Sequence, residues 1–198
     1  KELKCTQHTI ISDRIVASTL MSCAAITGSD ITLKGIICEH LGAVISIFEE
    51  AGCKINCAEG NMYFKSPQKL RSVKGIRTMP YPGFPTDAQA VMMAVATVAR
   101  GTSVIVENIF EGRFKHVGEL VRMGAKIKLE GKVAIVDGVE CLYGTRVSSP
   151  DLRGGAALIV AGLAAKGITQ INELNHIDRG YERLDVCLKN IGADIERR

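Results

Sequence analysis

Asp151-Leu-Arg-Gly-Gly-Ala-Ala157 opens an Ala-rich run, and two earlier stretches follow the same plan: Asp13-Arg-Ile-Val-Ala17 and Asp87-Ala-Gln-Ala-Val91. Each run ends at a glycine that lies 15, 14 or 16 residues after its aspartate, taken in chain order. These glycines are Gly28, Gly101 and Gly167. Asp is a preferred helix N-cap, Ala favours helix, and Gly suits the left-handed turn past a helix end. The pattern therefore predicts three equivalent helices.

The similarity continues beyond each predicted helix. A stretch rich in β-branched residues follows each glycine, and a second helical run then ends at another glycine, 39, 37 or 41 residues after the aspartate. The stretches are Ile31–Lys34, Ser103–Glu107 and Ile168–Asn172, and the later glycines are Gly52, Gly124 and Gly192. Agreement in both spacing and residue type indicates an internal threefold repeat.

The repeating unit is predicted to be strand–helix–strand–helix–strand–strand, which gives an α/β (α+β) fold. Copies one and two each offer two closing strands, whereas copy three offers only Asp194–Arg197. We therefore expect a strand from elsewhere in a longer protein to complete the third copy. The expected subunits are 1–66, 67–140 and 141–198, within one compact domain.

Composition excludes several classes of protein. The 198 residues are 46% hydrophobic with a net charge of +4, and the basic residues are scattered, which does not favour nucleic-acid binding. No apolar run is long enough to span a bilayer. Seven cysteines without a metal-ligand spacing are typical of reduced thiols in a cytosolic protein. The chain begins at Lys1, and we expect it to be part of a longer protein.

Four motifs occur together and in order along the chain. They are Phe84-Pro-Thr-Asp-Ala-Gln-Ala90, His116-Val-Gly-Glu-Leu-Val-Arg-Met-Gly-Ala125, Asp151-Leu-Arg-Gly-Gly-Ala-Ala-Leu158 and His176-Ile-Asp-Arg-Gly-Tyr-Glu-Arg183. With them, the chain from about Asp13 to Arg198 resembles the UDP-N-acetylglucosamine enolpyruvyl transferase family, of the EPSP synthase-like superfamily. The resemblance implies the C-terminal catalytic domain of a two-domain transferase. It also implies an inside-out α/β barrel-like domain of three βαβαββ units.

The resemblance implies a reaction as well as a fold. The family transfers the enolpyruvyl group of phosphoenolpyruvate to the 3′-hydroxyl of UDP-N-acetylglucosamine and releases phosphate, the first committed step of peptidoglycan synthesis. The reaction needs no metal or organic cofactor and takes place in the cytoplasm. Its active site would lie between this domain and an N-terminal domain. That other domain carries the family's reactive cysteine, so none of the seven cysteines is expected to be catalytic. The chain alone is expected to be inactive.

Each candidate site residue also has an ordinary structural interpretation. Asp87 is interpreted as a helix N-cap and, by resemblance, as the carboxylate that contacts the sugar hydroxyl and accepts its proton, and the two roles can coexist. Arg179 is either a surface residue in a turn or a partner of the phosphoenolpyruvate carboxylate or phosphate. Asp151 and Arg153 are either a cap and a solvated side chain or part of the closed site between the domains.

The resemblance adds further candidates. Arg113 would be another arginine of the same cleft, and Glu111 is a weaker candidate. Ile109 and Phe110 are either core residues or contacts to the uridine and sugar. Two more residues, Pro85 and Thr86, would lie against the same ligand. Asp13 and Arg14 are expected to have a structural or hinge-related role.

Two rival functions stay open. A related transferase acting on shikimate phosphate is disfavoured, because the Phe84 and His176 motifs match the UDP-sugar enzymes. A non-catalytic module that binds protein or RNA is disfavoured, because no basic run or aromatic platform is evident.

Overall fold

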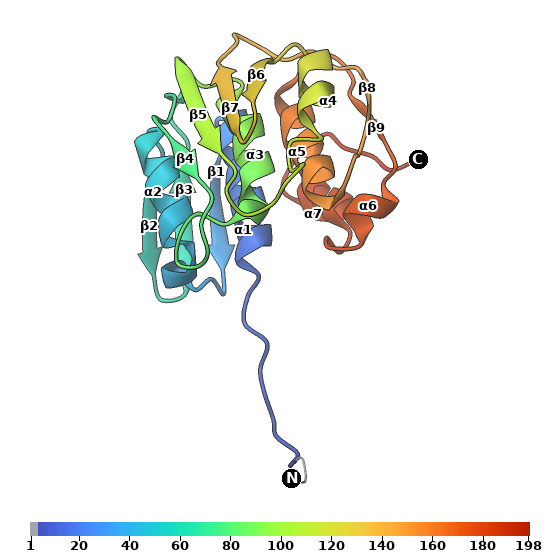
Figure 1. The fold of residues 1–198 in the computed structure, drawn as a ribbon. Helices are drawn as coiled ribbons and strands as arrows, with labels where there is room; N and C mark the ends of the chain where they lie inside the picture. Colours follow the sequence, from blue (N-terminus) through green and yellow to red (C-terminus); the bar gives the residue numbers. More distant parts are fainter. Residues whose placement is uncertain (1–3) are drawn as a thin grey trace.

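The computed structural model describes residues 4–198, in which three central helices pack against one another. They are α1 (Arg14–Thr27), α3 (Thr86–Ala96) and α5 (Leu152–Ala164). Figure 1 shows these helices side by side in the middle of the domain, with the strands around them. Met21, Met93 and Leu158, one from each helix, are completely buried. Burial of a helix on nearly all sides explains why these segments are so apolar.

The strands form three separate sheets, each built from one continuous part of the chain. The first has the order β1-β3-β2 and is antiparallel. The second has the order β4-β5-β7-β6, with β4 and β5 parallel, and the third pairs β8 with β9 in parallel. The strands are β1 (Asp30–Lys34), β2 (Lys54–Ala58), β3 (Asn61–Lys65), β4 (Ile76–Arg77), β5 (Thr102–Val106), β6 (Lys126–Glu130), β7 (Val133–Asp137), β8 (Arg146–Ser148) and β9 (Gln170–Asn172).

Shorter helices complete the domain and confirm the repeat. They are η1 (Cys38–Leu41), α2 (Gly42–Glu50), α4 (Val117–Arg122), α6 (Asn175–Asp178) and α7 (Leu184–Asn190). Helices α2, α4 and α7 each end two residues before a glycine. Those glycines are Gly52, Gly124 and Gly192, with φ of 101°, 97° and 100°. This left-handed conformation is one that glycine adopts readily, which explains the regular spacing.

The α/β fold is confirmed, but the βαβαββ unit is complete only in the second copy, from β4 to β7. The first copy has no strand before α1, where residues 4–13 have no regular structure and extend away from the domain (Figure 1). In the third copy the strand predicted at Asp194–Arg197 is wrong, since these residues are irregular. Without a paired neighbour, a short strand has no ladder of hydrogen bonds to form.

Two of the three predicted helix ends are also wrong. Gly28 caps α1 directly, with φ of 70° and its N–H donated to the carbonyls of Ala24 and Ala25. Helix α3 stops at Ala96 and α5 at Ala164, several residues before Gly101 and Gly167. Those two glycines have positive φ in the turns that lead to the next strands.

The expectation of reduced thiols is wrong for one pair of cysteines. Cys38, in η1, and Cys57, in β2, form a disulfide between Cα atoms 6.4 Å apart. Their sequence separation of 19 follows no recognisable disulfide spacing, so only the placement of η1 beside β2 reveals the pair. The other five cysteines are free.

Within residues 4–198, no helix combines the length and the apolar character needed to cross a bilayer. The same part of the chain contains no cluster of three or more His, Cys, Asp or Glu residues arranged to hold a metal ion.

Candidate functional site

The three central helices begin at the same end of the domain, but Asp87 starts its helix differently from the other two aspartates. Asp13 accepts hydrogen bonds from the N–H groups of Ile15 and Val16, and is an N-cap as predicted. In α3 the N-cap is Pro85, which makes no side-chain cap, and Asp87 is the second helical residue. The interpretation of Asp87 as an N-cap is therefore wrong, and its carboxylate is left for other partners.

Asp151 is an N-cap, as the sequence predicted. Its carboxylate accepts hydrogen bonds from the N–H groups of Arg153, at 3.0 Å, and Gly154, at 2.8 Å. The carboxylate of Asp151 thus holds the first turn of α5 in place, with Arg153 in that turn.

The carboxylate of Asp87 is held between two arginines. Arg113 donates from Nη2 to Oδ1 of Asp87, and Arg153 donates from Nη2 to Oδ2 at 3.2 Å. All three side chains are partly buried, with exposed fractions of 23% for Arg113, 18% for Arg153 and 37% for Asp87. Two guanidinium groups and one carboxylate leave a net positive charge at the starts of α3 and α5, where the helix dipoles also favour anions.

The pKa of Arg153 reflects this environment. Burial lowers the pKa of the guanidinium, but Asp87 and Tyr181 together, through their hydrogen bonds and charges, raise it, and the net shift is upward. Arg153 stays charged, and it is the kind of group that binds carboxylate or phosphate oxygens.

Tyr181 links this cluster to α1, a role that the sequence did not reveal. Nη1 of Arg153 lies 3.5 Å from the Tyr181 hydroxyl, and that hydroxyl lies 2.8 Å from Oγ1 of Thr19 in α1. The guanidinium also sits over the Tyr181 ring, 5.9 Å from its centroid. Tyr181 is 3% exposed, so its contacts hold the Arg153 side chain against the interior of the domain.

The loop from Glu107 to His116, between β5 and α4, carries several of the other candidates. Ile109 is half-buried and Phe110 is 54% exposed, so neither is an ordinary core residue. Arg113 lies over the Phe110 ring, 5.3 Å from its centroid. Pro85 and Thr86, at the start of α3, are half-buried, and Thr86 donates a hydrogen bond to Glu107 at 2.9 Å. The loop and the start of α3 are thus joined. Glu111 is exposed.

Arg179 is not part of the cluster in this structure. It is the C-cap of α6 and is exposed, and no residue from Lys4 to Arg198 forms a hydrogen bond or ion pair with its side chain. It lies two residues before Tyr181, so the chain places it near the cluster without a contact. The neighbouring Asp178 pairs with Arg197, whose hydrogen bond lowers the pKa of that carboxyl.

Two glycines allow α5 to begin close to its neighbours. A Cβ on Gly155 would lie 2.3 Å from Oγ of Ser149 and 2.5 Å from Cγ1 of Ile177. A Cβ on Gly154 would lie 3.0 Å from Cβ of His116. The Gly-Gly pair of the Asp151 motif is therefore a packing requirement.

His116 is a buried neutral histidine beside this helix start. It is 1% exposed, and burial lowers its pKa to about 4, with Asp151 acting to raise the pKa and Arg113 to lower it. Burial has the opposite effect on thiols, because it disfavours the thiolate: it raises the pKa of Cys23 and Cys53 to about 12, so both are protonated at neutral pH.

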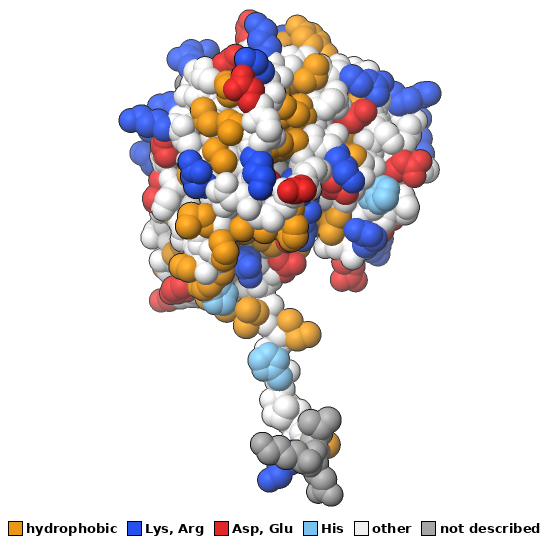
Figure 2. Space-filling model, viewed as in Figure 1, with side chains coloured by type: hydrophobic (Ala, Val, Ile, Leu, Met, Phe, Trp, Pro, Cys, Tyr) orange, Lys and Arg blue, Asp and Glu red, His pale blue; other side chains and the backbone are white. Residues whose placement is uncertain are grey.

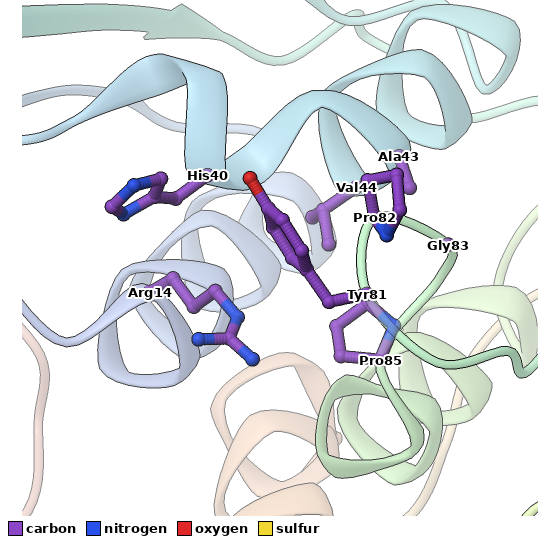
Figure 3. Close-up of a pocket in the computed structure, with 8 residues that line it drawn as sticks. All are labelled: Arg14, His40, Ala43, Val44, Tyr81, Pro82, Gly83 and Pro85. Atoms are coloured by element: carbon purple, nitrogen blue, oxygen red, sulfur yellow. The ribbon is translucent and has the colours of Figure 1, made fainter.

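A small cavity lies beside the site, between α2 and the loop before α3 (Figure 3). Its lining includes Arg14, His40, Tyr81 and Pro85, with the Arg14 guanidinium 5.7 Å from the Tyr81 ring centroid. Its volume of about 20 Å³ has room for one water molecule, not for a nucleotide sugar. A hollow of about 620 Å³ lies at the other ends of α1 and α3, and it contains none of the candidate residues.

Known proteins resemble this chain over its whole length. It is 50% identical over 198 residues to UDP-N-acetylglucosamine 1-carboxyvinyltransferase 1 of Caldanaerobacter subterraneus, covering 100% of this chain and 48% of that protein. It is 49% identical over 195 residues to the enzyme of that name from Myxococcus xanthus, covering 98% and 46% of the two chains. The chain thus spans about half the length of these relatives.

Solved structures share the fold. The enolpyruvyl transferase NikO from Streptomyces tendae superposes with a TM-score of 0.86 at 27% identity, over 96% of this chain and 45% of that one. EPSP synthase from Acinetobacter baumannii superposes with a TM-score of 0.76 at 21% identity, over 96% and 47%. The model of the family described as EPSP synthase (3-phosphoshikimate 1-carboxyvinyltransferase) matches residues 1–186. The chain belongs to this family of carboxyvinyl transferases.

Proposed function

We propose that this chain is the C-terminal catalytic domain of a UDP-N-acetylglucosamine enolpyruvyl transferase, which acts in peptidoglycan synthesis. The observation that carries the proposal is the carboxylate of Asp87, held by Arg113 and Arg153 where α3 and α5 begin. A fixed carboxylate beside two cations suits a reaction that joins a sugar hydroxyl to an anionic enol ester. Relatives that are about 50% identical carry the name of this activity, which supports the choice of substrate.

In the proposed reaction, the 3′-hydroxyl oxygen of the sugar adds to C2 of phosphoenolpyruvate and loses its proton, while C3 gains a proton and becomes a methyl group, which gives a tetrahedral ketal. Phosphate then leaves C2 as C3 loses a proton, so the enol double bond forms again. Asp87 would contact the hydroxyl and accept its proton, while arginines would bind the carboxylate and phosphate. Pro85, Thr86, Ile109 and Phe110 would lie along the sugar and uridine.

The arginines keep hydrogen-bonding capacity for such a ligand. Each guanidinium has five N–H donors, and Nε of Arg113 is buried without a partner among residues 4–198. An incoming anion could bind these donors and compete with Asp87 for them, which would free a carboxylate oxygen for the sugar. We propose that Arg179 joins the site when substrate binds, since its side chain is exposed and no residue from Lys4 to Arg198 forms a hydrogen bond or ion pair with it.

The chain would supply half of the active site, and an N-terminal domain the remainder. The test is phosphate release from phosphoenolpyruvate in the presence of UDP-N-acetylglucosamine. The full-length protein should turn over, whereas the 198-residue chain alone should not. Turnover by the isolated chain would refute the half-site proposal.

A transferase acting on shikimate 3-phosphate is the second candidate, because the family model is described by that activity. EPSP synthase from Acinetobacter baumannii is only 21% identical and supports the fold alone. Calorimetric titration of the full-length protein with each acceptor separates the two candidates. Heat with UDP-N-acetylglucosamine and none with shikimate 3-phosphate is expected.

A module that binds RNA is disfavoured by the surface. Figure 2 shows Lys and Arg side chains interspersed with acidic and hydrophobic ones on this face, not gathered into a stripe. Retention of RNA on a filter at moderate salt would support this alternative.

A cytoplasmic location is part of the proposal. Disulfides are rare in that compartment because its thiols are usually kept reduced, so the Cys38–Cys57 disulfide bears directly on this part of the proposal. Trapping of thiols in lysed cells, followed by mass spectrometry, would test the location, and a fully oxidised pair in the cell would count against the cytoplasm.

A further inference from the structure

Glu107 is a buried carboxylate that the proposed chemistry does not use. It follows β5 directly and is 2% exposed. No residue from Lys4 to Arg198 forms an ion pair with it. A buried carboxylate without a cation is costly unless its oxygens accept several hydrogen bonds.

Four donors satisfy this carboxylate. Oε1 accepts from the Thr78 hydroxyl at 2.9 Å, from the N–H of Ile109 at 2.9 Å and from the N–H of Phe110 at 3.1 Å. Oε2 accepts from the Thr86 hydroxyl at 2.9 Å. One side chain therefore joins three segments: the residue after β4, the first residue of α3 and the loop after β5.

These segments carry the two sides of the proposed sugar-nucleotide site. Thr86 is next to Asp87, and the loop presents Ile109 and Phe110, with Arg113 three residues further on. The geometry of Glu107 thus fixes the distance between the proposed base and the proposed uridine-binding loop. A misplacement of about 1 Å in such an arrangement can reduce the rate about 100-fold.

The third repeat provides an internal comparison. Thr78 donates its N–H to the carbonyl of Val106, and Ser149 donates to Asn172 in the same way, so Glu173 occupies the position of Glu107. Glu173 is exposed, and its side chain accepts no hydrogen bond from any residue between Lys4 and Arg198. The third copy therefore folds without this network, and the presence of the network in the second copy points to a role in the site.

We propose that Glu107 is a positioning residue for binding of the UDP-sugar, because it ties the Ile109–Phe110 loop to the start of α3. This inference rests on the proposed function. The residue does not touch the substrates, and it acts through Thr86 and through the backbone of the loop.

The test is steady-state kinetics of the full-length protein with both substrates varied. Glu107→Ala should raise KM for UDP-N-acetylglucosamine about tenfold and lower kcat about tenfold, with KM for phosphoenolpyruvate changed less than about twofold. Glu107→Gln should recover most of the loss, since its amide oxygen can accept the three bonds made by Oε1 and its NH₂ can donate to Thr86. Glu173→Ala, at the equivalent position, should behave like the wild type.

A purely structural role would change the two KM values together, or would lower only the melting temperature, and either result would overturn the proposal. If Glu107→Ala does not fold, Thr78→Val is the substitute, because it removes one donor to the carboxylate. It should raise KM for UDP-N-acetylglucosamine by less than Glu107→Ala does, again with little change in KM for phosphoenolpyruvate. Equal changes in both KM values would count against the inference. An inactive wild type would overturn the proposed function as a whole. An active wild type with unaffected Glu107 variants would overturn this inference alone.

Discussion

Asp87 and Arg153 are each the second residue of a central helix, and their side chains meet with Oδ2 and Nη2 3.2 Å apart. Equivalent positions in two copies of one repeat thus carry opposite charges that face each other. Since Pro85 takes the N-cap position of α3, the Asp87 carboxylate is not used by the helix and can serve the site.

Removing the charge of Asp87 should stop the proposed reaction. Asp87→Asn keeps the shape but can no longer accept a proton, so kcat should fall about 100-fold or more in the full-length protein. Phosphate release measures the rate. Asp185→Asn is the matched control, because Asp185 is the second residue of α7 and none of residues 4–198 forms an ion pair with it. A wild-type rate for Asp87→Asn would exclude Asp87 as the base.

The planar guanidinium of Arg153, which can bind two partners at once, should matter more for the reaction than its positive charge. Arg153→Lys keeps the charge but cannot bind Asp87 and the Tyr181 hydroxyl together, so kcat/KM should fall about tenfold. Arg122→Lys alters an exposed ion pair with Glu119 and should change little. Equal effects of the two substitutions would show that the geometry of Arg153 is unimportant.

The repeat could be predicted from the sequence because a glycine follows the second helix of each copy. Gly52, Gly124 and Gly192 all have positive φ after a short helix, and such positions strongly select glycine. The predicted start of α3 is wrong, because an alignment of the three aspartates places Asp87 at the N-cap, which Pro85 occupies. In the second copy, a loop from Met79 to Phe84 precedes α3. In the third copy, only Pro150 lies between Ser149 and the N-cap Asp151. Aspartates at equal spacing along the sequence therefore do not occupy the same position at the start of each helix.

The partners of Tyr181 and Glu107 could not be predicted from local patterns. Tyr181 meets Thr19 across 162 residues, and Glu107 meets Thr78 across 29. A single charged residue directly after β5 is the only signal for Glu107 in the sequence. The Cys38–Cys57 pair likewise depends on the packing of η1 against β2.

Protonation of His116 should reduce stability as the pH falls. Its pKa is about 4 when folded and 6.5 unperturbed, so the unfolded chain binds the proton first. Stability should therefore decline from about pH 6.5 to pH 4, by at most about 3 kcal/mol from this group. Denaturation in urea at several pH values measures the decline. His116→Gln should reduce the fall in the free energy of unfolding over this pH range, and His8→Gln should not. Parallel dependences on pH for the two variants would contradict the prediction.

The glycine pair of α5 should not tolerate a side chain. Gly155→Ala would bring a methyl group against Ser149 and Ile177, and should destabilise the protein by about 1–3 kcal/mol. Gly118→Ala is the control, because a Cβ at that position in α4 meets nothing within 4 Å, and it should be neutral or slightly stabilising. The difference in melting temperature between the two variants checks the prediction, and similar values would contradict it.

The structure of the full-length protein with bound UDP-N-acetylglucosamine would test the proposed site most directly. The sugar 3′-hydroxyl should lie within hydrogen-bond distance of the Asp87 carboxylate, with the uridine against Ile109 and Phe110. A nucleotide sugar bound away from the starts of α3 and α5, with Asp87 still held only by Arg113 and Arg153, would contradict the proposal.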